Sequence, residues 1–131
     1  MRILSLDIGR KRTGVAFLDE EAIGIVMPLK TLRHGSEQEF LDAVSMIIRD
    51  RGVHQIAIGL PKLLSGKEGS QAEFVRSRAE RLRVLGIPFT FVDERYTSRE
   101  LSPALPRRKS PGRVNPDELA VIAILEAYIR S

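Results

Sequence analysis

Three acidic residues occupy positions at which a fold alone does not require a charge. Asp7 lies near the end of an alternating apolar stretch, Glu94 follows a second apolar stretch, and Asp117 lies in the first turn of an apolar helical pattern. Converging carboxylates repel one another unless cations lie between them, and such oxygen ligands suit Mg²⁺ or Mn²⁺. One or two ions of this kind would support phosphodiester hydrolysis by activating a water and stabilising the leaving oxygen.

Each acid also has a purely structural interpretation. Asp7 can cap the turn into Gly9, and Asp93 with Glu94 can form a solvated strand end. Asp117 can simply favour the dipole at the start of its helix. Spacing alone leaves the structural and the metal-binding interpretations open.

The elements that must position these acids follow from hydrophobic periodicity. Strand-like stretches cover residues 2–8, 13–18, 22–32, 55–60 and 88–92. Short connections favour antiparallel pairing of the first three strands, whereas the last two each follow a helix and join parallel to the first by right-handed crossovers. The predicted fold class is α/β, with a mixed five-stranded sheet flanked by helices. Asp7 and Glu94 then share the carboxyl edge of the sheet, where open α/β sheets build their sites.

Capping signals predict three helices between and after these strands. Ser36 with Glu39 and Ser70 with Glu73 have the spacing of capping boxes. Gly52 and Gly86 stand where the first two helices should end. The third helix has its predicted N-cap at residue 115, with proline in the first helical position.

Composition sets the class of protein. The 131 residues are 43% hydrophobic and 29% charged, which indicates one globular domain of ordinary size covering 1–131. The absence of cysteine excludes disulfides, thiolate zinc sites and cysteine nucleophiles. No apolar stretch approaches the roughly 20 residues of a membrane span, and the first residues lack the pattern of a secretory signal. We therefore expect a cytoplasmic protein.

Positive charge is concentrated in one part of the chain. The net charge is +4, and residues 76–113 alone carry ten basic and four acidic side chains. A second basic cluster is Arg10, Lys11 and Arg12. These residues form either a solvated face or a footprint for a phosphate backbone.

Four motifs, in order and spread over nearly the whole chain, resemble the YqgF/RuvX family of Holliday junction resolvases, also described as pre-ribosomal-RNA nucleases. They are LDIGRKRTGVA at 6–16, IGLP at 58–61, VDERYTS at 92–98 and NPDELAVIAILEAYI at 115–129. The resemblance implies a ribonuclease H-like nuclease domain that uses Mg²⁺ or Mn²⁺ to cut a DNA junction or the 5′ end of pre-16S rRNA. It also implies that Asp7, Glu94 and Asp117 are the metal ligands and catalytic residues.

The same resemblance assigns roles to further residues. Gly9, Gly14, Gly59 and Pro61 are expected to shape the backbone around the site, with Asp93 beside Glu94. The expected nucleic-acid contacts are Arg10, Lys11, Arg12, Arg95, Tyr96, Thr97, Arg107, Arg108, Lys109 and Arg113. Symmetric cutting of a four-way junction would need two active sites, and hence a homodimer, whereas RNA trimming would not.

Two other functions remain as alternatives. A nucleic-acid-binding ribosome-assembly factor without catalysis fits the basic segment but leaves the three acids unexplained. An actin-like ATP-binding domain shares the Asp-Ile-Gly start and the Thr-Gly-Val-Ala run of 13–16, but such proteins carry two domains in much longer chains.

Overall fold

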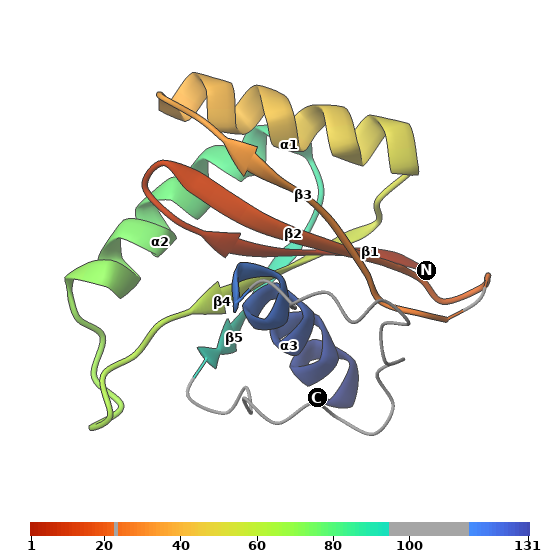
Figure 1. The fold of residues 1–131 in the computed structure, drawn as a ribbon. Helices are drawn as coiled ribbons and strands as arrows, with labels where there is room; N and C mark the ends of the chain where they lie inside the picture. The colour runs from red at the N-terminus through yellow and green to blue at the C-terminus, as the bar shows by residue number, and fades with distance from the viewer. Residues whose placement is uncertain (23, 95–115) are drawn as a thin grey trace.

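Five strands, three helices and one short 3₁₀ helix make up the described part of the chain (Figure 1). The computed structural model describes residues 1–22, 24–94 and 116–131, and of residues 116 and 117 it describes the backbone only. In chain order the elements are β1 (Arg2–Ile8), β2 (Arg12–Asp19), β3 (Met27–Arg33), α1 (Glu37–Arg51), β4 (Gln55–Leu60), α2 (Ser70–Glu80), the 3₁₀ helix η1 (Arg81–Leu85), β5 (Phe89–Asp93) and α3 (Pro116–Arg130).

The strands form one mixed sheet in the order β3-β2-β1-β4-β5. β1 pairs antiparallel with β2 and parallel with β4, β2 pairs antiparallel with β3, and β4 pairs parallel with β5. The predicted fold class, strand order and strand directions are therefore confirmed. Because β1, β4 and β5 run in the same direction, Asp7 and Glu94 lie at the same edge of the sheet.

One face of the sheet carries small side chains and is covered by α3. The Ser5 hydroxyl on this face donates a hydrogen bond of 3.0 Å to the carbonyl of Val121. The other small residues at alternating positions on this face are Gly14, Ala16, Ala57 and Gly59. Their size lets an apolar helix approach the strands closely, and Val121, Ile122 and Leu125 of α3 pack there on Ile3 and Leu18.

The opposite face carries the larger core, under α1, α2 and η1 (Figure 1). The predicted caps of α1 are confirmed: the Ser36 hydroxyl accepts from the backbone N–H of Glu39 at 3.2 Å, and Gly52 adopts φ 62°. The predicted box at the start of α2 is wrong. Gly69 is the N-cap there, without a side-chain hydrogen bond, and Ser70 is already the first helical residue.

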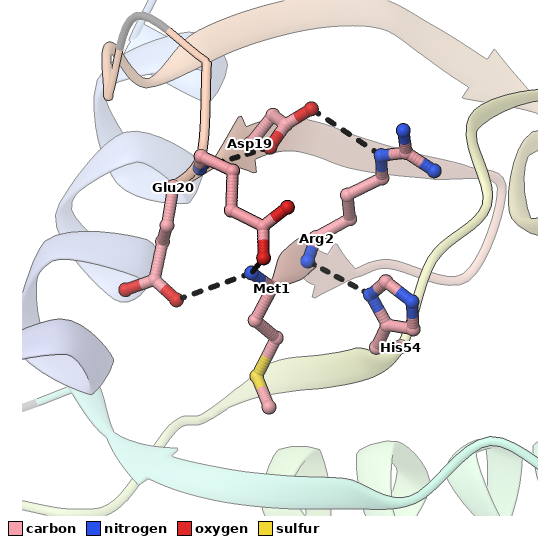
Figure 2. Close-up of polar contacts among 6 residues, drawn as sticks. Met1, Arg2, Asp19, Glu20 and His54 are labelled. Atoms are coloured by element: carbon pink, nitrogen blue, oxygen red, sulfur yellow. Dashed lines mark hydrogen bonds and ion pairs between the residues drawn. The ribbon is translucent and has the colours of Figure 1, made fainter.

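Polar contacts join the chain at the opposite edge of the sheet, where β1 and β4 begin and β2 ends (Figure 2). Arg2 Nε lies 3.3 Å from Asp19 Oδ2, and the Arg2 backbone N–H donates to His54 Nδ1 at 3.0 Å. The N-terminal ammonium lies 3.9 Å from Glu20 Oε1. At this edge the charged and polar side chains therefore contact one another. The predicted acids Asp7 and Glu94 lie at the other edge, where β1, β4 and β5 end.

In the part of the chain that the structure describes, no helix is long and apolar enough to cross a membrane.

Candidate functional site

Two of the three predicted acids meet at the carboxyl edge of the sheet. Asp7 is the penultimate residue of β1, opposite Gly14 of β2, and Glu94 directly follows β5. Burial, the charge of Asp7, a hydrogen bond with Asp7 and the charge of Asp93 together raise the pKa of Glu94 to about 7. The two carboxyl groups therefore interact directly, which spacing alone had left open.

Gly59 makes room for this pair. It lies one residue from the end of β4 and pairs with Val92 of β5. A Cβ atom at residue 59 would stand 2.5 Å from Glu94 Oε1 and would also collide with the Ile124 side chain of α3. Residue 59 must therefore be glycine, because the Glu94 carboxyl group and the Ile124 side chain of α3 both pack directly against this position of β4.

The third acid is less completely described. Asp117 belongs to the first turn of α3, and its side chain lies outside the described residues. The helix itself is fixed on the sheet by the Ser5–Val121 hydrogen bond and by Ile124 above Gly59. Its beginning lies beside β4 in Figure 1.

The carboxylate oxygens of Asp7 and Glu94 are chemically suited to bind a divalent cation. Asp7 and Glu94 supply carboxylate oxygens, the ligands that Mg²⁺ and Mn²⁺ prefer. The raised pKa of Glu94 means that two negative charges at this point are costly without a cation. Among the residues that the structure describes, no group of three or more metal-ligating side chains is assembled, and the side chain of Asp117 is not one of them.

The turn after Asp7 brings positive charge to the same edge. The Gly9 backbone N–H donates to the Arg12 carbonyl at 2.9 Å, and a Cβ atom at residue 9 would stand 2.5 Å from that oxygen. Arg10, Lys11 and Arg12 are exposed. The sequence thus correctly identified a glycine-dependent turn that presents three cations next to the first acid.

Sequence reasoning missed a buried polar cluster behind this turn. The His34 backbone N–H donates to the Lys11 carbonyl at 3.0 Å, and His34 Nε2 lies 2.8 Å from Thr13 Oγ1. Arg78 of α2 is 9% exposed, and its guanidinium lies 4.9 Å from the centre of the Phe74 ring. Burial and the nearby Arg78 charge lower the pKa of His34, so this histidine is neutral at physiological pH. The sequence gives no signal for this cluster, since it joins residues from β2 and α2 with His34, the residue after β3.

A second missed residue lies beside the acids. Lys62 Nζ in the loop after β4 lies 3.6 Å from Asp93 Oδ2. Asp93 therefore contributes to the site by holding this loop against the end of β5. Pro61, expected near the site, begins the same loop.

The arginines of α2 and η1 do not form the free basic surface that the charge pattern suggested. Each lies within 4 Å of a carboxylate: Arg76 of Glu68, Arg78 and Arg81 of Glu37, and Arg83 of Glu80. Each of these four side chains thus has an acidic partner within the protein, and the phosphate-footprint interpretation stays a prediction for them. The remaining expected contacts, Arg95, Tyr96, Thr97, Arg107, Arg108, Lys109 and Arg113, lie outside the described residues.

Comparisons with known proteins agree with this geometry. A relative in Desulforudis audaxviator, named "Putative pre-16S rRNA nuclease", is 39% identical over 137 residues, covering 100% of this chain and 95% of its own. Thermus thermophilus RuvC in complex with a Holliday junction shares the fold with a TM-score of 0.64 and 13% identity, over 99% of this chain and 95% of the other. The yeast mitochondrial Holliday junction resolvase Ydc2 gives a TM-score of 0.54 with 14% identity, over 98% and 77% of the two chains.

The family model described as "RuvX: Holliday junction resolvase" matches residues 1–131. The match covers the whole chain, and the fold of the mixed five-stranded sheet is shared with the RuvC structure. This chain belongs to the RuvX family of nucleases.

Proposed function

We propose that this protein is a divalent-metal-dependent endonuclease that hydrolyses phosphodiester bonds in precursor 16S rRNA. The observation that carries the proposal is the contact between Asp7 and Glu94 at the carboxyl edge, with the pKa of Glu94 raised to about 7. An acid pair of this kind binds cations and is costly as a purely structural feature. The RNA substrate is favoured because relatives with that name match the whole chain at 39% identity.

In this proposal, Asp7, Glu94 and Asp117 hold Mg²⁺ or Mn²⁺. The bound ion supplies Lewis-acid stabilisation of the phosphate and a more acidic water. The protein's own contribution is positional. Gly59 leaves the space in which Glu94 faces Asp7, and the 9–12 turn fixes cations where a phosphate backbone would pass.

A second candidate substrate is a four-way DNA junction. The family description and the fold shared with the junction-bound RuvC favour it. Paired cutting of a symmetric junction would require a homodimer, because each copy offers one acid pair.

A cleavage assay tests the proposal and separates the two substrates. Precursor 16S rRNA, a four-way DNA junction and a fully paired duplex are incubated with Mg²⁺ or with Mn²⁺. We expect Asp7→Asn, Glu94→Gln and Asp117→Asn each to lower the cleavage rate by at least about 100-fold, because each removes a ligand charge. Asp50→Asn, at an exposed position near the end of α1, is the matched control and should retain full activity.

Retained cleavage in two of the three acid variants would reject the metal site. Cutting of the junction alone would reject the RNA assignment while leaving the nuclease proposal standing.

A further inference from the structure

The loop between β4 and α2 carries two exposed leucines, and its base adjoins the candidate site. In Figure 1 this loop extends beyond the end of β4, away from the helices. It leaves the sheet at Leu60, which pairs with Asp93, so its base adjoins the acid pair. At its tip Leu64 is 97% exposed, and the neighbouring Leu63 is 56% exposed.

The tip is an ordered turn. The Leu63 backbone N–H donates to the Lys67 carbonyl at 2.9 Å, and the Gly66 N–H donates back to the Leu63 carbonyl at 2.8 Å. Gly66 has φ 92°, a conformation that favours glycine. Leu64 is thus the outermost residue of a hydrogen-bonded turn.

Two charged contacts anchor the base of the loop. Lys62 Nζ lies 3.6 Å from Asp93 Oδ2, on the side of the acids. On the other side, Arg76 of α2 donates two hydrogen bonds of 2.6 and 2.7 Å to the Glu68 carboxylate. The loop is therefore held from β5 and from α2 at once, and the leucine tip is presented in a fixed position.

An exposed apolar side chain on a loop whose base adjoins the proposed catalytic acids is suited to contact a base of the nucleic-acid substrate. Proteins insert leucine and similar side chains between bases, and the cost is lowest where bases are already unpaired or unstacked. Lys67, also exposed, stands three residues from Leu64 and adds a cation for a flanking phosphate. The turn therefore presents an apolar side chain and a cation close together, as the bases and the phosphates of a nucleic-acid strand require.

We propose that Leu64 packs against an unpaired or branch-point base of the substrate and so selects nucleic acid that is not continuously paired. This inference rests on the proposed function for the nature of the substrate and deepens it. In this inference the β4–α2 loop recognises unpaired or branch-point bases, and the acids carry out cleavage.

Binding and base unstacking, measured in EDTA so that cleavage does not occur, test the inference. The probes are a single-stranded precursor 16S rRNA end, a four-way DNA junction and a paired duplex, each with 2-aminopurine at the unpaired, branch-point or equivalent position. Leu64→Ser should weaken binding of the first two by about tenfold and abolish the 2-aminopurine increase, since it removes the apolar side chain that packs against the base. Duplex affinity should change less than about twofold.

Val84→Ser is the matched control, since Val84 is 74% exposed in η1. It should behave as the wild type, and Leu64→Phe should retain both binding and unstacking. Equal affinities of wild type and Leu64→Ser for all three probes would overturn the inference and point to a protein partner at the tip. Equal losses on all probes would overturn it as well. Failure of the nuclease proposal would appear separately, as absence of cleavage with intact binding.

Discussion

The most direct consequence of the acid pair concerns stability in the absence of metal. Burial and the charges of Asp7 and Asp93 raise the pKa of Glu94 from 4.5 to about 7. One pKa unit corresponds to about 1.4 kcal/mol, so this shift means that ionised Glu94 costs the folded state at most about 3.5 kcal/mol. Solvent screening of this half-buried group reduces that figure, and we expect Glu94→Gln to stabilise the metal-free protein by about 2 kcal/mol at pH 8.

The sign of the pH dependence follows from the raised pKa. Below about pH 4.5, Glu94 is neutral in both the folded and the unfolded state, and the charge costs nothing. Between about pH 4.5 and 7 the unfolded state ionises first, so the wild type loses stability relative to Glu94→Gln. Above about pH 7 the difference stays constant.

Urea unfolding at pH 5, 6, 7 and 8 in EDTA measures this difference, with Asp50→Asn as the control. Adding Mg²⁺ or Mn²⁺ should then reduce the advantage of Glu94→Gln, because the ion binds and stabilises only the protein that keeps its ligands. A variant no more stable than the wild type at pH 8, or an advantage independent of pH, would refute the acid-pair reasoning.

Two further predictions follow from the packing around the site. Gly59→Ala should destabilise the protein by about 1–3 kcal/mol and lower cleavage, because its Cβ would meet Glu94 and Ile124. Gly69→Ala, whose Cβ would stand 3.5 Å from its nearest neighbour, should cost less in urea unfolding and keep activity. The lowered pKa of His34 means that the unfolded state takes up a proton first, so stability should fall as the pH drops below about 6.5. In urea unfolding at pH 5 to 7, His34→Gln should flatten this slope by up to about 1.4 kcal/mol per pH unit.

Most of the fold could be predicted because its signals are local. Alternation marked the strands, Ser36 and Gly52 bounded α1, and chain connectivity allowed one sensible strand order. The errors lie where tertiary contacts override local pattern. Ser70 has the spacing of an N-cap relative to Glu73, yet Gly69 is the N-cap of α2 and Ser70 is its first helical residue.

The site could be predicted where it depends on the ends of parallel strands, and not where it depends on contacts between layers. Asp7 and Glu94 meet because β1 and β5 lie in one parallel set with β4 between them. The charge pattern predicted a surface position for Arg78. In the structure Arg78 is buried, and its guanidinium packs on the aromatic ring of Phe74. Lys62 gave no signal because its partner, Asp93, belongs to a distant strand.

The pairing of the α2 and η1 arginines changes where a phosphate backbone can be expected to bind. Those four side chains lie next to carboxylates of the protein itself, and binding a phosphate there would require breaking contacts such as the bidentate Arg76–Glu68 pair. The other residues of the two basic clusters lie at 10–12 and 95–113. Both stretches follow one of the acids in the chain: the first begins three residues after Asp7, and the second starts directly after Glu94. The substrate is therefore expected to approach along the carboxyl edge, which carries the acid pair and the 9–12 turn, rather than across α2.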